Sequence, residues 1–218
     1  MLLKRISLFL PILLGLAAIS FAADAAPCAC CSETGAYYIT TTKPEQYQLD
    51  AFKEMAFTPN AFLYMTEAGE DSIKGIENFS QIYSSESWVA EPYGFNFAGS
   101  FLNKSWKMTF KDGKGRVGTL TLPVPTTMVD FDVDIHDGES SAGGGPSLYK
   151  EWRFKGNTGG GTGFFQKGIV PSTTYFLVFQ GRGNMCDNAS DFTHWRLEIR
   201  GPKAEYSFFG KMKTPSGS

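Results

Sequence analysis

The chain has 218 residues, with 20 lysines and arginines against 22 aspartates and glutamates, for a formal net charge of −2. This balance lacks the basic footprint that nucleic-acid binding needs, so we expect no nucleic-acid partner. An aromatic content of 15%, with 24 glycines and 11 prolines, favours strands and turns over a helical bundle. The length is enough for one domain with its own core and too small to require two.

Residues 1–25 have the three parts of a Sec-type signal peptide. A positively charged start precedes the apolar residues 8–21, and Ala23-Asp24-Ala25 is a small-residue cleavage site. The alternative, an uncleaved membrane anchor, needs about 18 or more apolar residues, and this run is shorter. We therefore expect a secreted or periplasmic protein that has no membrane attachment after cleavage.

Four cysteines follow the signal peptide: Cys28, Cys30 and Cys31 lie in the segment 26–43, and Cys186 lies far downstream. In an oxidising compartment, cysteines form at least one disulfide by default. An intrachain bond from Cys186 can reach only the N-terminal cluster, although the sequence does not fix which of the three is its partner. A soft-metal site for Cu(I) or Zn is the alternative use of these thiols, without the spacing of a structural zinc site.

The globular domain is expected over residues 44–213, followed by a short polar tail at 214–218. Thr42 as cap and Glu45 as its capping-box partner predict a short helix over 44–56. A strand is expected over 61–66, and a second short helix over 73–82 from its apolar spacing.

From about residue 88 onward the chain reads as short strands joined by turns. The glycine-rich segment 156–163 is expected to be a hairpin loop, since it lacks the Gly-Lys-Ser/Thr ending of a phosphate loop. The sequence contains no repeat with a period of 20–50 residues, which argues against a propeller or solenoid. We predict an all-β fold, an antiparallel jelly-roll-like sandwich or barrel, with one or two short helices in its N-terminal third. The expected strands cover 95–97, 106–111, 116–122, 128–136, 148–154, 164–166, 173–180, 193–200 and 204–211.

Residues 129–139 carry the sharpest polar pattern. Along a strand, the side chains of Val129, Phe131 and Val133 would face the core, and the aspartates between them would share the opposite face. Hard oxygen ligands suit Ca²⁺, which makes the end of this strand a candidate cation site. The other interpretation is a solvated outer face whose charges discourage edge pairing. The candidate metal ligands are Asp134, His136, Asp137 and Glu139.

The remaining candidates concern sugars and catalysis. Trp88 and Tyr93 are candidate stacking platforms for sugar rings, whereas strand alternation assigns the other tryptophans, Trp106, Trp152 and Trp195, to the core. His194 falls on the polar face of its strand and is expected to be exposed. A glycosidase-type carboxylate pair depends on distances that sequence does not give. Its possible members are Glu91, Asp132, Asp134, Glu151 and Glu198.

Three functions are consistent with these features. The first is an exported binding or structural module without catalysis, stapled by at least one disulfide, whose ligand is a saccharide, a metal ion or another protein. The second is an enzyme that acts on an extracellular polymer through paired carboxylates. The third is a protein that handles a soft metal through its cysteines.

Overall fold

The computed structural model describes residues 37–64, 73–77, 79, 93–133, 148–183 and 188–213. Within these residues, eleven strands form one antiparallel sheet in the order β1-β6-β7-β9-β10-β11-β2-β3-β4-β5-β8. The all-β antiparallel fold with a helix in its N-terminal third is thereby confirmed. The elements are β1 Tyr37–Thr42, α1 Gln46–Glu54, β2 Phe57–Tyr64, β3 Tyr93–Leu102, β4 Ser105–Lys111, β5 Val117–Pro123, β6 Met128–Val133, β7 Tyr149–Asn157, β8 Gly160–Gly163, β9 Thr174–Arg182, the 3₁₀ turn η2 Ala189–Asp191, β10 Phe192–Gly201 and β11 Ala204–Met212.

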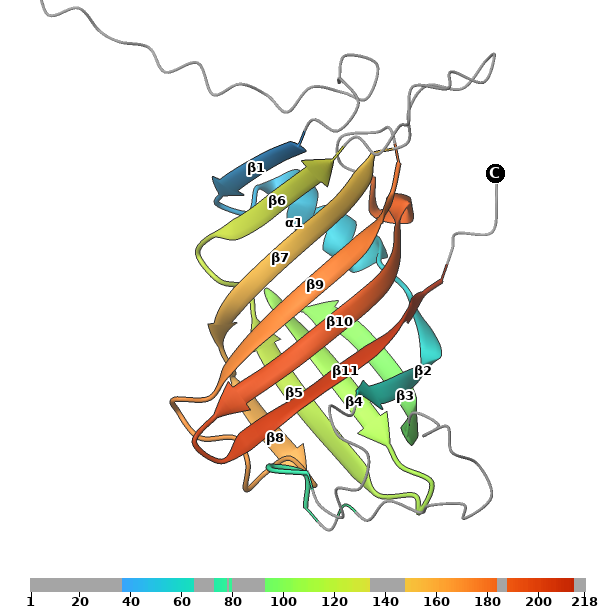
Figure 1. The fold of residues 1–218 in the computed structure, drawn as a ribbon, viewed down its shortest axis with the longest axis vertical. Helices are drawn as coiled ribbons and strands as arrows, with labels where there is room; N and C mark the ends of the chain where they lie inside the picture. The colour runs from blue at the N-terminus through green and yellow to red at the C-terminus, as the bar shows by residue number, and fades with distance from the viewer. Residues whose placement is uncertain are drawn as a thin grey trace, which may run out of the picture.

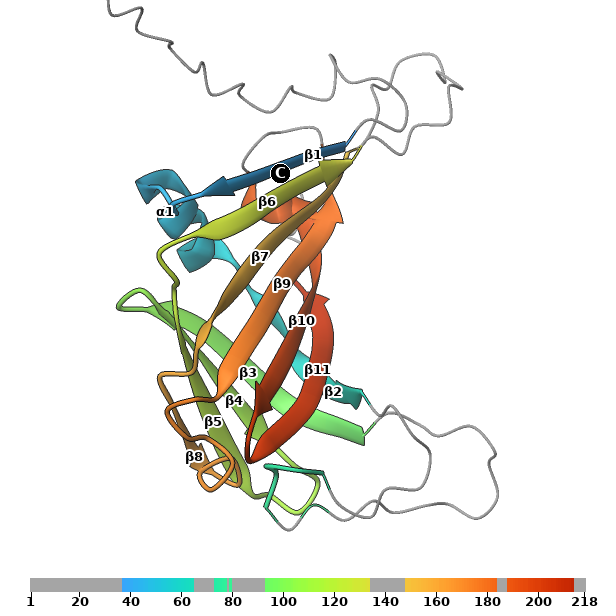
Figure 2. The ribbon, with the colours of Figure 1, turned by 60° about the vertical axis from the view of Figure 1, so that its left-hand side comes forward.

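The sheet consists of two runs of neighbouring strands. Strands β2 to β5 pair in chain order, and so do β6, β7, β9, β10 and β11; the pairing of β11 with β2 joins the two runs. The sheet folds over so that the two runs face each other as layers (Figures 1 and 2). Its edge strands β1 and β8 do not pair with each other, so the sheet is not closed.

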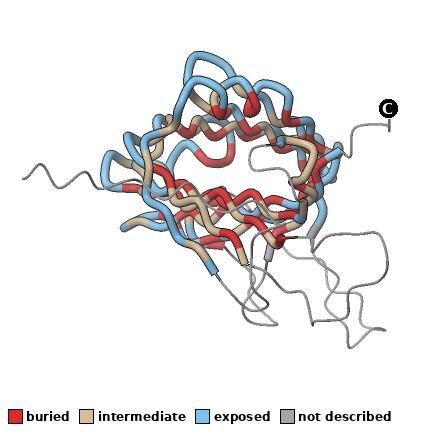
Figure 3. The backbone as a smooth tube through the Cα atoms, turned by 90° about the horizontal axis from the view of Figure 1, so that it is seen from above, coloured by how far each residue is buried: buried red, intermediate tan, exposed pale blue. Residues whose placement is uncertain are grey.

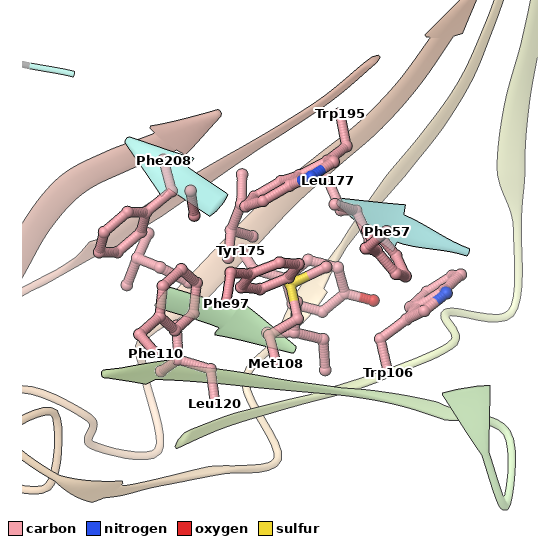
Figure 4. Close-up of a cluster of buried hydrophobic side chains, with 14 of the residues drawn as sticks. Phe57, Phe97, Trp106, Met108, Phe110, Leu120, Tyr175, Leu177, Trp195 and Phe208 are labelled. Carbon is pink, nitrogen blue, oxygen red and sulfur yellow. The ribbon is translucent and has the colours of Figure 1, made fainter. Parts of the chain in front are cut away.

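The buried core residues come from both layers, and the backbone of each layer is marked by alternating buried positions (Figure 3). Trp106, Trp152 and Trp195 have no more than 1% of their surface exposed, which confirms their predicted place in the core. The Phe97 ring stacks on the Trp195 indole with centroids 4.7 Å apart, so the two layers meet through aromatic side chains (Figure 4).

Helix α1 begins differently from the sequence prediction. Glu45 is its N-cap, and its side chain and that of Gln48 form a reciprocal capping box with each other's backbone N–H groups. The predicted cap, Thr42, instead ends strand β1 and donates its hydroxyl to the Lys43 carbonyl. The expected helix is therefore present, but it is shorter than 44–56 at both ends.

Helix α1 packs against both layers through one side chain. The centroid of the Phe52 ring is 5.3 Å from the ring centroids of Trp152 and Phe154 in β7. It is 5.3 Å from that of Trp106 in β4 and 5.5 Å from that of Phe101 in β3. Phe52 is 1% exposed. The helix therefore bridges the layers near the β1 and β6 end of the sheet (Figure 2).

Two N-terminal predictions need correction. The helix expected over 73–82 is absent from its described part, residues 73–77 and 79, although Ile73, Ile76 and Phe79 are buried as its spacing required. The strand expected over 61–66 begins earlier, because residues 58–60 already belong to β2, Phe57–Tyr64. Pro59 is tolerated there because pairing with β3 starts only at the next residue and the pairing with β11 is irregular at this point.

The glycine-rich segment is also more ordered than predicted. β7 continues to Asn157, and residues 160–163 form the edge strand β8, paired with β5, instead of a hairpin loop. Gly163 has a φ of +60°, a backbone conformation that its lack of a Cβ permits. Phe164 and Phe165, expected in a strand, lie in a turn and are buried in the core.

The turn predicted between β4 and β5 is confirmed, and Asp112 organises it. Its carboxylate accepts hydrogen bonds from the backbone N–H groups of Lys114 and Arg116, at 3.0 and 2.8 Å, and from the Arg116 guanidinium at 2.7 Å. Burial opposes ionisation of Asp112, but these donors outweigh it and lower the pKa of the carboxyl below its usual value.

We expect Asp112→Ala to lower the free energy of unfolding by about 1.5–3 kcal/mol at neutral pH, because charge-assisted hydrogen bonds to a buried carboxylate are lost. A depressed pKa in the folded state means that this contribution is present above the unfolded-state pKa, near 4, and is lost as the pH falls through the lower folded-state pKa. Urea unfolding of both proteins at neutral pH and near pH 2 should show the stability gap shrinking in acid. A gap of equal size at both pH values would contradict this account.

Candidate functional site

Strand β6 presents the opposite faces to those predicted. Asp130 lies directly opposite Trp152 in β7, and the aspartate two residues on, Asp132, is only 8% exposed. Phe131 and its apolar neighbours point to the outer face of the sheet instead. The predicted faces are wrong because the register with β7 places Asp130 opposite the buried Trp152 and Asp132 opposite the buried Lys150.

The inward-facing polar side chains include a buried ion pair. Lys150, 3% exposed, lies opposite Asp132 in the β6–β7 register, and its Nζ is 2.9 Å from an Asp191 carboxylate oxygen. Asp191 ends the turn η2, directly before β10. A Cβ at Gly183 would lie 2.0 Å from the Asp191 carboxyl group, and one at Gly181 would lie 1.8 Å from the Asp191 carbonyl oxygen. The ion pair thus holds the segment before β10 against β7. The glycines at 181 and 183 leave the room that Asp191 needs there, because they have no side chain.

The outer face of β7, β9 and β10 carries many charged and aromatic side chains. Cross-strand pairing aligns its side chains in rows, since partners in adjacent strands point to the same face. The rows, from β7 through β9 to β10, are Glu151–Gln180–His194, Arg153–Val178–Arg196 and Lys155–Phe176–Glu198, preceded by the pair Tyr149–Arg182.

The balance of charge on this face is positive, although the whole chain has a net charge of −2. The outer face of β7, β9, β10 and β11 carries six cationic side chains and three carboxylates. The cations are Arg153, Lys155, Arg182, Arg196, Arg200 and Lys211; the carboxylates are Glu151, Glu198 and Glu205.

Tyr149 and Glu151 are fixed on this face by a local network. The Tyr149 hydroxyl donates to Glu151 at 2.5 Å, and the Arg153 guanidinium donates to the same carboxylate at 2.5 Å. Arg153 also lies over the Phe131 ring, 4.4 Å from its centroid. Burial and the hydrogen bond to Glu151 raise the pKa of Tyr149 to about 12, so the phenol keeps its proton at physiological pH.

Two open grooves lie at opposite ends of the outer face. Their volumes are about 300 Å³ and about 330 Å³. With about 3.4 Å per residue along a strand, the groove centres are about 20 Å apart, because about six residues separate them along β7. The first groove is lined by Tyr149, Gln180, Gly181, Arg182, Thr193 and His194, and the second by Lys155, Thr174, Tyr175, Phe176, Glu198 and Arg200.

The structure tests only some of the sequence candidates. His194 is exposed, as predicted, and its Nδ1 is 2.9 Å from the Thr193 hydroxyl. Tyr93 begins β3. No three His, Cys, Asp or Glu side chains gather into a metal site among the residues that the structure describes. The candidates outside the described residues are Cys28, Cys30, Cys31, Trp88, Asp134, His136, Asp137, Glu139 and Cys186.

The described candidates for a catalytic carboxylate pair do not come together. Asp132 faces inward, whereas Glu151 and Glu198 face outward from β7 and β10. Strand spacings place Glu151 and Glu198 about 16 Å apart, beyond the roughly 5–10 Å that glycoside hydrolysis requires. The other two candidates, Glu91 and Asp134, lie outside the described residues.

The outer-face cations were missed as a group in the sequence analysis. Their signal was present in each strand separately, as the alternation of Arg153 and Lys155 with core residues in β7, and of Arg196 and Arg200 with core residues in β10. Only the register through β9 shows that the two polar faces form one surface.

Comparisons with known proteins give no match: no protein-family model and no curated protein matches the sequence, and no solved structure matches the fold. Within the described part of the chain, no helix has the length and apolar character that crossing a membrane requires.

Proposed function

We propose that the protein is an exported binding module that holds an extended polysaccharide on the outer face of β7, β9 and β10. The observation that carries this proposal is the pair of open grooves on one continuous sheet face. Small-molecule ligands are typically enclosed on most of their surface. Shallow grooves in line along the strands fit a long chain that binds through several units.

The lining of the grooves fits sugar chemistry. Half-buried Phe176 offers an aromatic surface in the second groove, on which the apolar face of a sugar ring can stack. Around it, the Thr174 hydroxyl and the charged ends of Lys155 and Arg200 can bond sugar hydroxyls. In the first groove, Gln180 and Thr193 supply the same kind of polar groups.

Export and a disulfide are part of this proposal, supported by the signal-like residues 1–25 and by the sheet register. The chain enters β1 at Tyr37 and leaves β9 at Arg182 at the same end of the sheet, through the partners Val133 and Tyr149. β1 and β9 are three strands apart, or about 14 Å, and each intervening residue can span about 3.3–3.6 Å. A bond between Cys186 and the N-terminal cluster is therefore within reach, and counting thiols before and after reduction tests it.

The binding proposal is tested by affinity electrophoresis of the mature protein in gels that contain soluble neutral or acidic polysaccharides. We expect retardation by at least one polymer, and Phe176→Ala should weaken that binding about tenfold, as expected for a loss of about 1.4 kcal/mol of stacking. Phe209→Ala is the matched control, because Phe209 is exposed on the outer face of β11 but lines neither groove.

The control should bind like the unmodified protein. The proposal fails if no polysaccharide retards the protein, or if Phe176→Ala and Phe209→Ala weaken binding equally.

A further inference from the structure

We infer that the polysaccharide held on this face is acidic and carries one carboxylate on each of its sugars, as a polyuronate does. The inference rests on the proposed function and assigns the chemistry of its ligand. It follows from where the cations lie and from which of them have no carboxylate partner.

The carboxylates closest to the grooves are already neutralised by neighbours. Glu151 accepts from Tyr149 and Arg153, and it is only 16% exposed. Glu198, 19% exposed, has Arg196 at 3.4 Å and Arg200 at 3.3 Å. These internal pairs remove most of the negative charge that would repel an anionic ligand.

Three cations on the same face have no carboxylate partner in the part of the chain that the structure describes. Among the described residues, no carboxylate lies within ion-pair distance of Lys155, Arg182 or Lys211. Arg182 lines the first groove and Lys155 lines the second, so each groove holds one cation without a carboxylate partner. An anionic group bound there would meet a positive charge that no described carboxylate of this face pairs with.

Each of the two groove cations, Arg182 and Lys155, lies opposite an aromatic ring. Tyr149 in β7 lies directly opposite Arg182 in β9, and Lys155 in β7 lies directly opposite Phe176 in β9. The same combination of ring and cation therefore occurs at both ends of the face, about 20 Å apart along the strands. A uronate unit presents the complementary combination, an apolar ring face beside one carboxylate.

The spacing of the charges favours carboxylated over densely sulfated polymers. The partnerless cations are dispersed, with one in each groove, and do not form the block of like charges that suits a ligand of high charge density. Polygalacturonate, with one carboxylate per sugar, is the probe that matches this arrangement, and dextran sulfate is the probe for dense sulfation.

The test is titration calorimetry of the mature protein with polygalacturonate, with the same polymer after reduction of its carboxyl groups, and with dextran sulfate. We expect polygalacturonate to bind at least tenfold more tightly than the other two, and to lose that advantage between about 0.05 M and about 0.5 M salt as the charges are screened. The double variant Lys155→Gln/Arg182→Gln should bind polygalacturonate at least tenfold more weakly. The control, Lys203→Gln, removes an exposed cation in the turn between β10 and β11 and should change nothing.

Four results overturn the inference. Equal binding of the carboxyl-reduced polymer would show that charge is not recognised, while the proposed polysaccharide function would stand. Tighter binding of dextran sulfate, or full binding by a correctly folded double variant, would show that the grooves do not select uronate. Binding of no polysaccharide of any kind would refute the proposed function itself.

Discussion

Replacing Lys150 with alanine is expected to lower the free energy of unfolding by about 3–5 kcal/mol, the cost of leaving a buried charge without its partner. Lys150 is 3% exposed and Asp191 is 12% exposed, so the pair is largely shielded from water. The loss falls on the Asp191 carboxylate, which Lys150 contacts. Urea unfolding at neutral pH measures the difference.

Two further variants distinguish the effect of an unpaired buried charge from the effect of removing any lysine. Replacing both partners, as Lys150→Met with Asp191→Leu, should recover much of the lost stability, because no uncompensated charge remains. Lys53→Ala removes a comparably close pair, 2.5 Å from Asp50, but both side chains are more than half exposed. It should cost at most about 1 kcal/mol. A Lys150→Ala protein as stable as Lys53→Ala would contradict the account.

Phe52→Ala is expected to cost about 3–5 kcal/mol, since it leaves a cavity among four aromatic rings. The change removes the contact by which α1 holds the two layers together at one end, so the far-UV helical signal should also weaken. Urea unfolding of Phe52→Ala and of Leu102→Ala gives the comparison. Leu102 is 68% exposed in β3, and its loss should cost no more than about 0.5 kcal/mol. Equal destabilisation by the two changes would show that α1 is not anchored by Phe52.

Local sequence patterns predicted most of the strands because each carried a period-two signal or a strong turn. The hairpin of β4 and β5 around Asp112 is an example, since apolar residues alternate in both arms and Asp-Gly stands between them. Two strands had weaker signals. β8 consists of three glycines and a threonine and is held in place by its pairing with β5, and β1 is held by its pairing with β6.

Strand β6 shows why alternation alone does not decide which face is buried. Its apolar and acidic residues alternate equally well, so hydrophobicity favoured Phe131 for the core. The register with β7 decided otherwise, because the buried Trp152 lies opposite Asp130. The outer face then stabilises Phe131 through the Arg153 guanidinium, a contact between strands that neither sequence segment reveals.

The candidate site was hidden for the same reason. The sequence showed Arg196 and Glu198 on a polar face and His194 beside them, and it showed a row of charges in β7. These two polar faces form one surface only through β9, which lies between β7 and β10. The apolar sequence of β9 predicts a core strand, although Phe176 and Gln180 lie on its outer side. Pairing order, and not local composition, assembles the grooves.

The central claim is that a polysaccharide lies along the outer face of β7, β9 and β10, across both grooves. Mapping backbone amide shifts by NMR during titration with polygalacturonate tests it most directly. We predict shifts that cluster around Arg182 and His194 at one end and around Phe176 and Arg200 at the other, with the outer face of β3 to β5 unchanged. Shifts confined to the β3 to β5 layer, or to one groove alone, would contradict the account.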